Sequence, residues 1–453
     1  MNSAYQQGNL VELDIIDLNH RGDGVGKFQE RTVFVPGTVT GDRVLVRLTH
    51  LKRQYAYGKV QKILSSSPYR IRPSCIVADK CGGCQWQHID PNYQHYAKQD
   101  QVTQALQRIG GFENPPVAPI LPSSEVFGYR NKATYPLGHS TTGNIQAGYY
   151  QRNSHQLINL NQCPIQDPRL NPLLADIKKD LQQQDWTIYD EKSHQGQLRH
   201  LALRIGKRTG EILLTLISTD KKLANLDQQA RIWLKRYPNL VGITLNYNPH
   251  RGNVIFGQET FLIAGRHYLR EKFAQLEFEL GCDTFFQINT ETAETLLNIL
   301  LKNLGLTGQE RIIDAYCGIG TFTLPLAQQV AEVIGIESNP NSIIQAQKNA
   351  QINNIHNVSF YQGTVQKILP KLEFKADIVL LDPPRKGCDR MVIDTLRNLQ
   401  PSSIVYISCQ PGTLARDLQQ LCQGELYQLI WVKPADFFPQ TPHVESIAFI
   451  RHG

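Results

Sequence analysis

The stretch that decides the fold is Arg311–Ala327, "RIIDAYCGIGTFTLPLA", which is followed by the apolar run "VIGIE" ending at Glu337. The first part reads as a strand, a glycine loop and the start of a helix, and "VIGIE" reads as the next strand. Gly318 and Gly320 let the backbone of the loop come close to a ligand. A carboxylate that ends the second strand can accept hydrogen bonds from both hydroxyls of a ribose. The stretch therefore predicts a nucleoside-binding turn at the edge of an α/β sheet.

The segments around this stretch continue the same alternation. After about residue 266, short buried runs alternate with helical segments, and these runs are "RIIDAY", "EVIGIE", "VSFYQG", "ADIVLLD" and "SSIVYIS". This alternation is typical of a parallel, doubly wound sheet. The loop lacks the third glycine of the dinucleotide fingerprint, which disfavours NAD. The pattern D-x-x-C-G-x-G-T with an acidic second-strand end instead resembles the Rossmann-like fold of class I S-adenosylmethionine (AdoMet) methyltransferases.

The remaining sequence predicts two further domains, both rich in strands. Residues 8–65 read as five short alternating strands, which predicts a small OB-like barrel because so small a sheet has to hide its edges. Residues 116 to about 265 carry more alternating strands with helical insertions near 170–185 and 222–236, which indicates a mixed, β-rich domain. We therefore expect three domains, at residues 1–66, 67–265 and 266–453.

Charge and composition restrict the partners of the chain. The 453 residues carry a formal net charge of +7 and contain no apolar run long enough to span a bilayer. Between residues 43 and 72 there are eight cationic side chains and no carboxylate, namely Arg43, Arg47, Lys52, Arg53, Lys59, Lys62, Arg70 and Arg72. Such a field suits a polyanion, which favours a nucleic acid. The N-terminal segment shows no secretory signal, so we expect a cytoplasmic protein without a membrane partner.

Residues that can take part in a reaction follow the fourth and fifth strands of the sheet. Asp382 follows the fourth strand in "LLDPPRKG", and the arginine after its two prolines, Arg385, argues against an exocyclic amine as the methyl acceptor. Cys409 ends the fifth strand, and Pro411 is placed to begin a helix whose N-terminal amides favour a thiolate. A thiolate that adds to C6 of uracil makes C5 nucleophilic enough to accept a methyl group. The cysteine therefore predicts methylation at carbon.

This chemistry also needs a base, because the proton at C5 has to leave before the enzyme is released. The segment "DFFPQTPHVES" near the C-terminus offers Asp436, His443 and Glu445. Each of the three can accept a proton on chemical grounds. The sequence alone does not choose among them.

Together, "DPPRKG", "ISCQPGTLARDL" and "DFFPQTPHVES" resemble the RNA (uracil-C5) methyltransferase family, the RumA/TrmA group, across the catalytic half. The resemblance implies that Cys409 is the nucleophile and that Glu445 removes the C5 proton. It also implies that Phe285 lines the base pocket. Gln410 stands where the family usually has Asn, so uracil contacts through this position are open. The AdoMet contacts that the resemblance implies are Gln287, Tyr316, Glu337 and Asp382.

Four other cysteines predict a metal site. Cys75, Cys81 and Cys84 lie within ten residues, and Cys163 follows at a distance. Four thiolates can hold either zinc or an iron–sulfur cube, and the spacing does not separate the two. The C-x5-C-G-G-C element resembles the [4Fe–4S] site of the rRNA branch of the same family, and "NHRGDGVGKFQERTVFVPG" resembles a TRAM domain, an RNA-binding module.

These features favour an AdoMet-dependent uridine-C5 methyltransferase of large-subunit rRNA that acts as a monomer. Three alternatives stay open: a tRNA uracil-C5 methyltransferase, an RNA cytosine-C5 methyltransferase and a non-catalytic iron–sulfur RNA-binding protein. A cytosine enzyme would carry a cysteine after the first proline of the fourth-strand motif, where this chain has Pro384 and Arg385. A non-catalytic protein would leave Cys409, Glu445 and Asp382 without a role.

Overall fold

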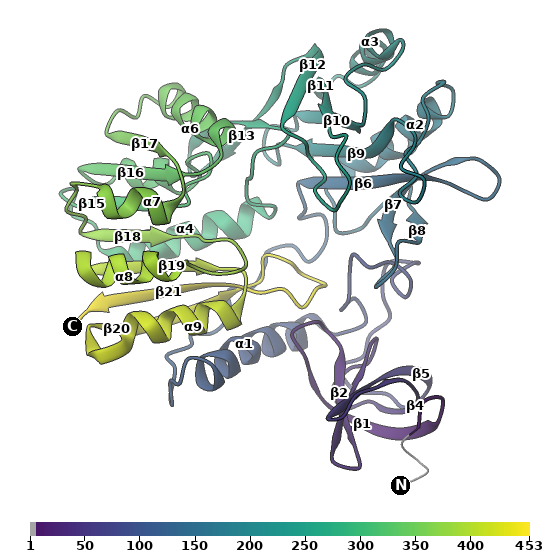
Figure 1. Cartoon of the computed structure of the whole chain (residues 1–453), viewed down its shortest axis with the longest axis horizontal. Helices are drawn as coiled ribbons and strands as arrows, with labels where there is room; N and C mark the ends of the chain where they lie inside the picture. Colours follow the sequence, from purple (N-terminus) through teal and green to yellow (C-terminus); the bar gives the residue numbers. More distant parts are fainter. Residues whose placement is uncertain (1–5) are drawn as a thin grey trace.

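The computed structural model of the chain describes residues 6–453. Figure 1 shows a barrel near the N-terminus, a central sheet, and a unit of sheet and helices that contains the C-terminus. Residues 1–5, which the sequence assigns to the first domain, lie outside the described residues. Within residues 6–453, no helix has both the length and the apolar character that a membrane crossing requires.

Five strands close into the N-terminal barrel, in the order β1-β2-β3-β5-β4. Burial alternates along β1, where Val11, Leu13 and Ile15 point inward, and along β4, where Val44 and Val46 do the same. The alternation fixes which face of each strand closes the barrel. The predicted barrel is confirmed, with strands at β1 (Leu10–Leu18), β2 (Gly24–Phe28), β3 (Arg31–Val35), β4 (Arg43–Leu51) and β5 (Tyr55–Ser65).

The central part is a seven-stranded sheet in the order β12-β11-β10-β9-β6-β7-β8. Helices α2 (Asn171–Leu181) and α3 (Leu226–Arg236) bury apolar side chains such as Ile177 and Trp233 in its core, and a 3-10 turn, η1 (Pro168–Leu170), precedes α2. The strands are β6 (Lys132–His139), β7 (Ile145–Tyr150), β8 (Leu157–Asn159), β9 (Leu198–Ile205), β10 (Ile212–Ser218), β11 (Leu240–Tyr247) and β12 (Glu259–Gly265).

The C-terminal sheet has the order β17-β16-β15-β18-β19-β21-β20. Strands β15 to β19 pair in parallel, whereas β21 lies antiparallel between β19 and β20. This confirms the predicted doubly wound sheet. The strand order reverses at β15, and ligands of such sheets bind beyond the carboxyl ends of the strands at this point. The strands are β15 (Arg311–Ala315), β16 (Glu332–Glu337), β17 (Val358–Gln362), β18 (Ile378–Leu381), β19 (Ser403–Ser408), β20 (Tyr427–Ala435) and β21 (Glu445–His452).

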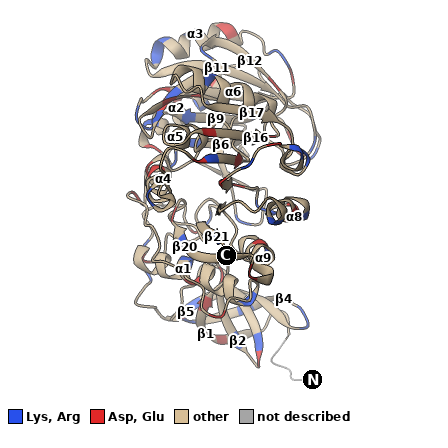
Figure 2. Cartoon of the chain, turned by 90° about the vertical axis from the view of Figure 1, so that its left-hand side faces the viewer, with Lys and Arg blue, Asp and Glu red and all other residues tan. Residues whose placement is uncertain are grey.

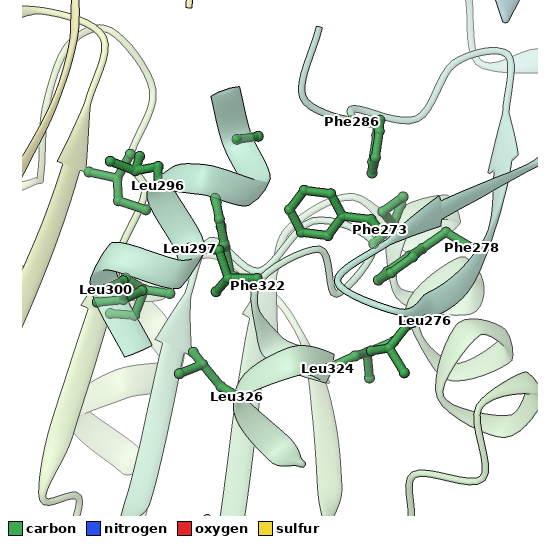
Figure 3. Close-up of a cluster of buried hydrophobic side chains, with 14 of the residues drawn as sticks. Phe273, Leu276, Phe278, Phe286, Leu296, Leu297, Leu300, Phe322, Leu324 and Leu326 are labelled. Carbon is green, nitrogen blue, oxygen red and sulfur yellow. The ribbon is translucent and has the colours of Figure 1, made fainter. Parts of the chain in front are cut away.

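Helices and a hairpin cover this sheet. The hairpin of β13 (Tyr268–Phe273) and β14 (Leu276–Gly281) packs with α4 (Thr290–Leu304) into one apolar cluster, and Figure 3 shows Phe273, Phe278 and Phe286 facing Leu297 and Phe322. The cluster holds the hairpin and α4, which precede β15 in the chain, against the catalytic sheet. The other helices are α5 (Thr323–Ala327), α6 (Pro340–Ile352), α7 (Val365–Ile368), α8 (Arg390–Leu399) and α9 (Pro411–Cys422), with 3-10 turns η2 (Leu369–Lys371) and η3 (Gln423–Glu425).

Helix α1 (Pro91–Arg108) belongs in space with the catalytic sheet, although the sequence assigns it to the middle domain. Its buried residues Val102 and Leu106 join the same core as residues of α9 and β20. The chain that follows α1 pairs with the edge strand β20 through bridges from Val117 and Leu121, so this edge is covered. In Figure 1, α1 lies between α9 and the barrel, and Figure 2 shows both helices next to the barrel.

Candidate active site

A cavity of about 710 Å³ opens beyond the carboxyl ends of the parallel strands. All six catalytic and cofactor-binding residues predicted from the sequence line this cavity, namely Gln287, Tyr316, Glu337, Asp382, Cys409 and Glu445. Tyr316, Glu337, Asp382 and Cys409 each end or directly follow a parallel strand. Because these ends meet at one edge of the sheet, residues that are far apart in the sequence share one cavity.

The glycine loop after β15 forms one wall of the cavity. Tyr316 has a φ of 76°, a left-handed conformation that a non-glycine residue adopts at a cost of about 1–3 kcal/mol. The Gly318 amide donates a hydrogen bond of 3.2 Å to the Glu337 carboxylate, whose other oxygen accepts from the Asn339 amide at 2.7 Å. The loop and the acidic strand end are therefore held together as one surface.

Asp382 follows β18 and turns a carboxylate toward the cavity. Within residues 6–453 this carboxylate makes no side-chain hydrogen bond, and burial, together with the nearby charge of Asp314, raises its pKa to about 7. A half-buried acceptor without a partner suits a ligand that brings hydrogen-bond donors or a positive charge. This fits the amino group and sulfonium of AdoMet.

Gln287 and Phe285 also line the cavity. The backbone carbonyl of Gln287 accepts a hydrogen bond of 2.8 Å from the Asn131 side chain, which ties this part of the cavity wall to the central sheet. The Phe285 ring is 62% exposed although it lines the cavity. An apolar ring that faces an open cavity offers a flat surface on which a base can stack.

Cys409 and Glu445 lie beside each other at the end of the β19–β21 pair. The register places Ser408 opposite Ser446, so Cys409 and Glu445 are the next two residues in line. Residues that oppose each other across antiparallel strands project to the same face. The sheet therefore directs the thiol and the carboxyl into one cavity.

The electrostatics of Cys409 differ from the sequence prediction of a favoured thiolate. Burial and the charge of Glu445 raise the pKa of the thiol to about 11, and Arg385 only partly opposes them. The prediction considered the N-terminus of α9 but not the carboxylates across the cavity. The thiol therefore carries its proton at neutral pH, and its ionisation has to accompany substrate addition.

The three candidate bases differ in their pKa shifts and in their position relative to the cavity. Burial, followed by the charge of Asp382, raises the pKa of Glu445 to about 8, and Glu445 faces the cavity. His443 also lines the cavity, with a pKa lowered to about 4 by burial and by nearby cations. Asp436 does not line the cavity, because its buried carboxylate is paired with Lys98 at 2.5 Å. Asp436 is therefore unsuited to take a proton from a substrate.

Arg385 is a residue of the cavity that the sequence did not assign to the site. It lines the cavity, and its charge acts on Cys409, Glu445 and His443. A cation here favours the ionised forms of both the thiol and the carboxyl. The sequence signal was its position directly after the Asp-Pro-Pro turn of the fourth strand.

The four predicted metal ligands line a second, small cavity. Cys75, Cys81, Cys84 and Cys163 surround it together with apolar residues and with Gln87, Tyr149 and Gln162, and no carboxylate, imidazole or ammonium group of the described chain lines it. Within residues 6–453, however, no three His, Cys, Asp or Glu side chains are arranged to hold a metal ion. The metal site therefore stays a prediction. The structure adds that the four cysteines line the same cavity.

The geometry of the site agrees with the comparison to known families. Residues 92–452 match the family model described as tRNA (Uracil-5-)-methyltransferase. The chain belongs to the uracil-5-methyltransferase family. Residues 5–61 match the TRAM domain, which coincides with the barrel.

Relatives of this uracil-5-methyltransferase family member extend over nearly the whole chain. A protein of Nostoc sp. (strain PCC 7120), described as an uncharacterized RNA methyltransferase, is 62% identical over 99% of this chain and 97% of its own length. A protein of Synechocystis sp. (strain PCC 6803) with the same description is 57% identical over 99% of this chain and 96% of its own. The chain is therefore an RNA methyltransferase of the uracil-5 family.

A solved structure resembles this uracil-5-methyltransferase in its overall fold. It is the Pyrococcus abyssi tRNA (uracil-54, C5)-methyltransferase in complex with S-adenosyl-L-homocysteine, with a TM-score of 0.77 and 27% sequence identity. The match covers 97% of this chain and 100% of that one. The barrel, the central sheet and the catalytic sheet thus occur together in a solved relative.

Proposed function

We propose that this methyltransferase transfers a methyl group from AdoMet to C5 of a uridine in RNA, with Cys409 as nucleophile and Glu445 as base. The observation that carries the proposal is the register of β19 and β21, which brings this thiol and this carboxyl side by side in the cavity that also holds the predicted cofactor residues. Addition of a thiol and removal of a proton are the two steps that carbon methylation requires of the protein.

In the proposed reaction the Cys409 thiol gives its proton to water as its sulfur forms a bond to C6 of the uracil ring. The electron pair of the C5–C6 double bond moves toward C5, which becomes nucleophilic. AdoMet, when bound by Gln287, Tyr316, Glu337 and Asp382, supplies the methyl group that C5 accepts. The Glu445 carboxylate then removes the proton from C5, the double bond forms again, and the sulfur leaves C6 with its electron pair.

The electrostatics of the cavity support this division of roles. Glu445, with its pKa near 8, is partly ionised near neutral pH and can both accept and release a proton. Arg385 stabilises the negative charge that develops on the sulfur. The target base has to leave its stack to reach Cys409, and Phe285 offers a surface on which it can stack.

Large-subunit rRNA is the substrate that we propose first, because the barrel and the four cysteines resemble the rRNA branch. A tRNA is the second candidate. The Pyrococcus abyssi protein, which is described as acting on tRNA uracil-54, matches 97% of this chain including the barrel region. The presence of an N-terminal barrel therefore does not by itself exclude tRNA.

The four-cysteine cavity supports a [4Fe–4S] cluster held by Cys75, Cys81, Cys84 and Cys163. Its four cysteines supply the thiolate ligands that such clusters use. A cube binds one thiolate at each of its four iron atoms, and this cavity offers four cysteines. We propose a structural role for the cluster in a cytoplasmic, monomeric enzyme whose three domains are residues 1–66, 67–265 and 266–453, with α1 of the second range packed against the third.

The experiment that tests the function uses labelled AdoMet and the purified protein with rRNA and tRNA in separate reactions. We expect labelled 5-methyluridine from one of the two RNAs after digestion to nucleosides. Labelled 5-methylcytidine would instead support the cytosine alternative. No label in either RNA, with AdoMet binding intact, would contradict the proposed reaction.

A further inference from the structure

The loop between β20 and β21, residues 436–444, brings several side chains to the active site. Phe437, Phe438 and His443 line the cavity, and Glu445 begins β21 where the loop ends. The strand register places the backbone of Glu445, and the loop forms the part of the cavity wall next to it. Gln440 in this loop has a φ of 69°, a left-handed conformation that persists only when the surroundings enforce it.

A lysine from helix α1 enforces this conformation at two points. The Lys98 ammonium donates to the Asp436 carboxylate at 2.5 Å and to the Phe438 carbonyl at 3.0 Å. The single ammonium therefore binds the residues on both sides of Phe437. His95, one turn earlier on the same helix, lies 3.3 Å from the other Asp436 oxygen. Lys98 is fully buried, although lysine is among the residues that are least often buried.

Other side chains from outside the catalytic sheet hold the following residues of the loop. Gln94 donates to the Gln440 side chain at 3.2 Å and accepts from the Gln440 amide at 3.0 Å. The Trp86 amide donates to the Gln440 carbonyl at 3.0 Å, and the Tyr129 hydroxyl donates to the Pro439 carbonyl at 3.1 Å. The loop therefore takes its shape from residues more than 300 positions earlier in the chain.

The Lys98–Asp436 pair is costly to bury, which indicates a specific role. Apolar residues of similar volume often replace a buried ion pair without loss of stability. The pKa of Asp436 stays below its usual value, because Lys98 and His95 outweigh the effect of burial. Asp436 thus remains a carboxylate that faces Lys98 and not the cavity, and its role is to hold the loop.

We propose that Lys98 is a positioning residue for methyl transfer: by fixing Asp436 and Phe438 it places the loop so that Glu445 can reach the C5 proton. This inference rests on the proposed uridine-C5 methylation. Lys98 does not touch the substrate. Its loss should therefore slow proton removal more than it weakens the binding of RNA.

The test compares Lys98→Met, Asp436→Asn and the double variant on RNA that carries tritium at C5 of uridine. Each single variant leaves a buried group without its partner and should melt at a lower temperature than the wild type. The double variant removes both charges and should recover most of this loss. Its kcat for tritium release should nevertheless stay about a hundred-fold below the wild type, with little change in KM for RNA.

Lys178→Met is the matched control. Lys178 also buries its ammonium among oxygens, those of Asn159, Leu160 and Asn161, but it lies on α2 of the central part and does not line the catalytic cavity. We expect a lower melting temperature and an unchanged kcat. An equal loss of kcat in Lys178→Met would show a general effect of lost stability and would overturn the inference.

Two further outcomes decide the matter. Wild-type kcat in the double variant would overturn the role of Lys98. If the double variant does not fold, Tyr129→Phe replaces it in the test, because this change removes only the hydroxyl that holds Pro439. We then expect kcat to fall about fivefold. An unchanged kcat would overturn the inference. Failure of the wild type to release tritium would instead refute the proposed function, so the two failures are distinguishable.

Discussion

Cys409 and Glu445 are neighbours across two strands of one sheet, although 35 residues separate them in the sequence. The pairing of Ser408 with Ser446 sets this relationship, and the sheet that carries it is the rigid core of the catalytic unit. A nucleophile and a base placed on a paired framework keep their separation without help from the substrate. The predictions below test what each group contributes.

Glu445→Gln keeps the size of the side chain and removes its ability to accept a proton. We expect kcat to fall by about 10²–10⁴-fold, while AdoMet and RNA still bind. The covalent adduct between Cys409 and RNA should accumulate, because its release requires proton removal. Electrophoresis under denaturing conditions measures this adduct. Wild-type turnover in this variant would exclude Glu445 as the base.

The rate should depend on pH through the ionisation of Glu445. Burial raises the pKa of this carboxyl to about 8, so it is mostly protonated and inactive as a base below that value. We expect kcat to rise about tenfold per pH unit below pH 8 and to level off above it. Single-turnover rates between pH 6 and 9 test this. A flat profile in the wild type would contradict the assignment.

Asp382→Asn should change how stability depends on pH. Burial and the charge of Asp314 raise the pKa of Asp382 from 3.8 to about 7 in the folded protein. Between these values the unfolded chain gives up a proton that the folded chain retains, so stability falls as the pH rises and the full penalty applies above pH 7. The variant lacks this penalty. Its melting temperature should exceed that of the wild type by about 2–4 °C or more at pH 8, and by less at pH 5.

Glu337→Gln should weaken AdoMet binding. The carboxylate holds the glycine loop through the Gly318 amide and is the predicted acceptor for the ribose hydroxyls. Loss of charged hydrogen bonds costs about 1.5–3 kcal/mol, which corresponds to a dissociation constant roughly 10–150-fold higher. Calorimetric titration with S-adenosylhomocysteine measures the dissociation constant. Glu332→Gln, at the other end of the same strand, is the control and should bind as the wild type does.

Cys84→Ser should remove the cofactor of the cysteine site. The wild-type protein, purified without oxygen, should contain four iron atoms per chain and absorb visible light, as a [4Fe–4S] cluster does. We expect both signals to be lost in Cys84→Ser and kept in Cys422→Ser, which alters a cysteine at the end of α9. One zinc per chain in the wild type would refute the cluster.

The catalytic sheet was predictable because its parallel strands are short apolar runs that end on residues with chemical roles. Asp382 and Cys409 stand where such runs stop, and a parallel sheet brings those ends together. The strand β20 and the hairpin of β13 and β14 were not predicted. Pro434 stands near the end of β20, and one inward position of β13 is Glu271, so neither strand is an uninterrupted apolar pattern.

Other features depend on contacts in the folded chain and could not be predicted from the sequence. Strand β9 is buried along almost its whole length but contains Arg199 and Arg204, so it lacks the alternation of a half-buried strand. The raised pKa of Cys409 depends on its burial and on Glu445 of the neighbouring strand. The pair of Lys98 and Asp436 joins residues 338 positions apart, and no local pattern signals such a contact.

The central claim, that Cys409 bonds to the uracil ring, is tested most directly by mass spectrometry of the enzyme incubated with AdoMet and RNA that contains 5-fluorouridine. Fluorine at C5 cannot leave as a proton does, so the covalent complex cannot break down. We predict a methylated nucleotide attached to the peptide that contains Cys409, and none in Cys409→Ala. Methylation of ordinary RNA by Cys409→Ala at the wild-type rate, or a nucleotide attached to another residue, would contradict the claim.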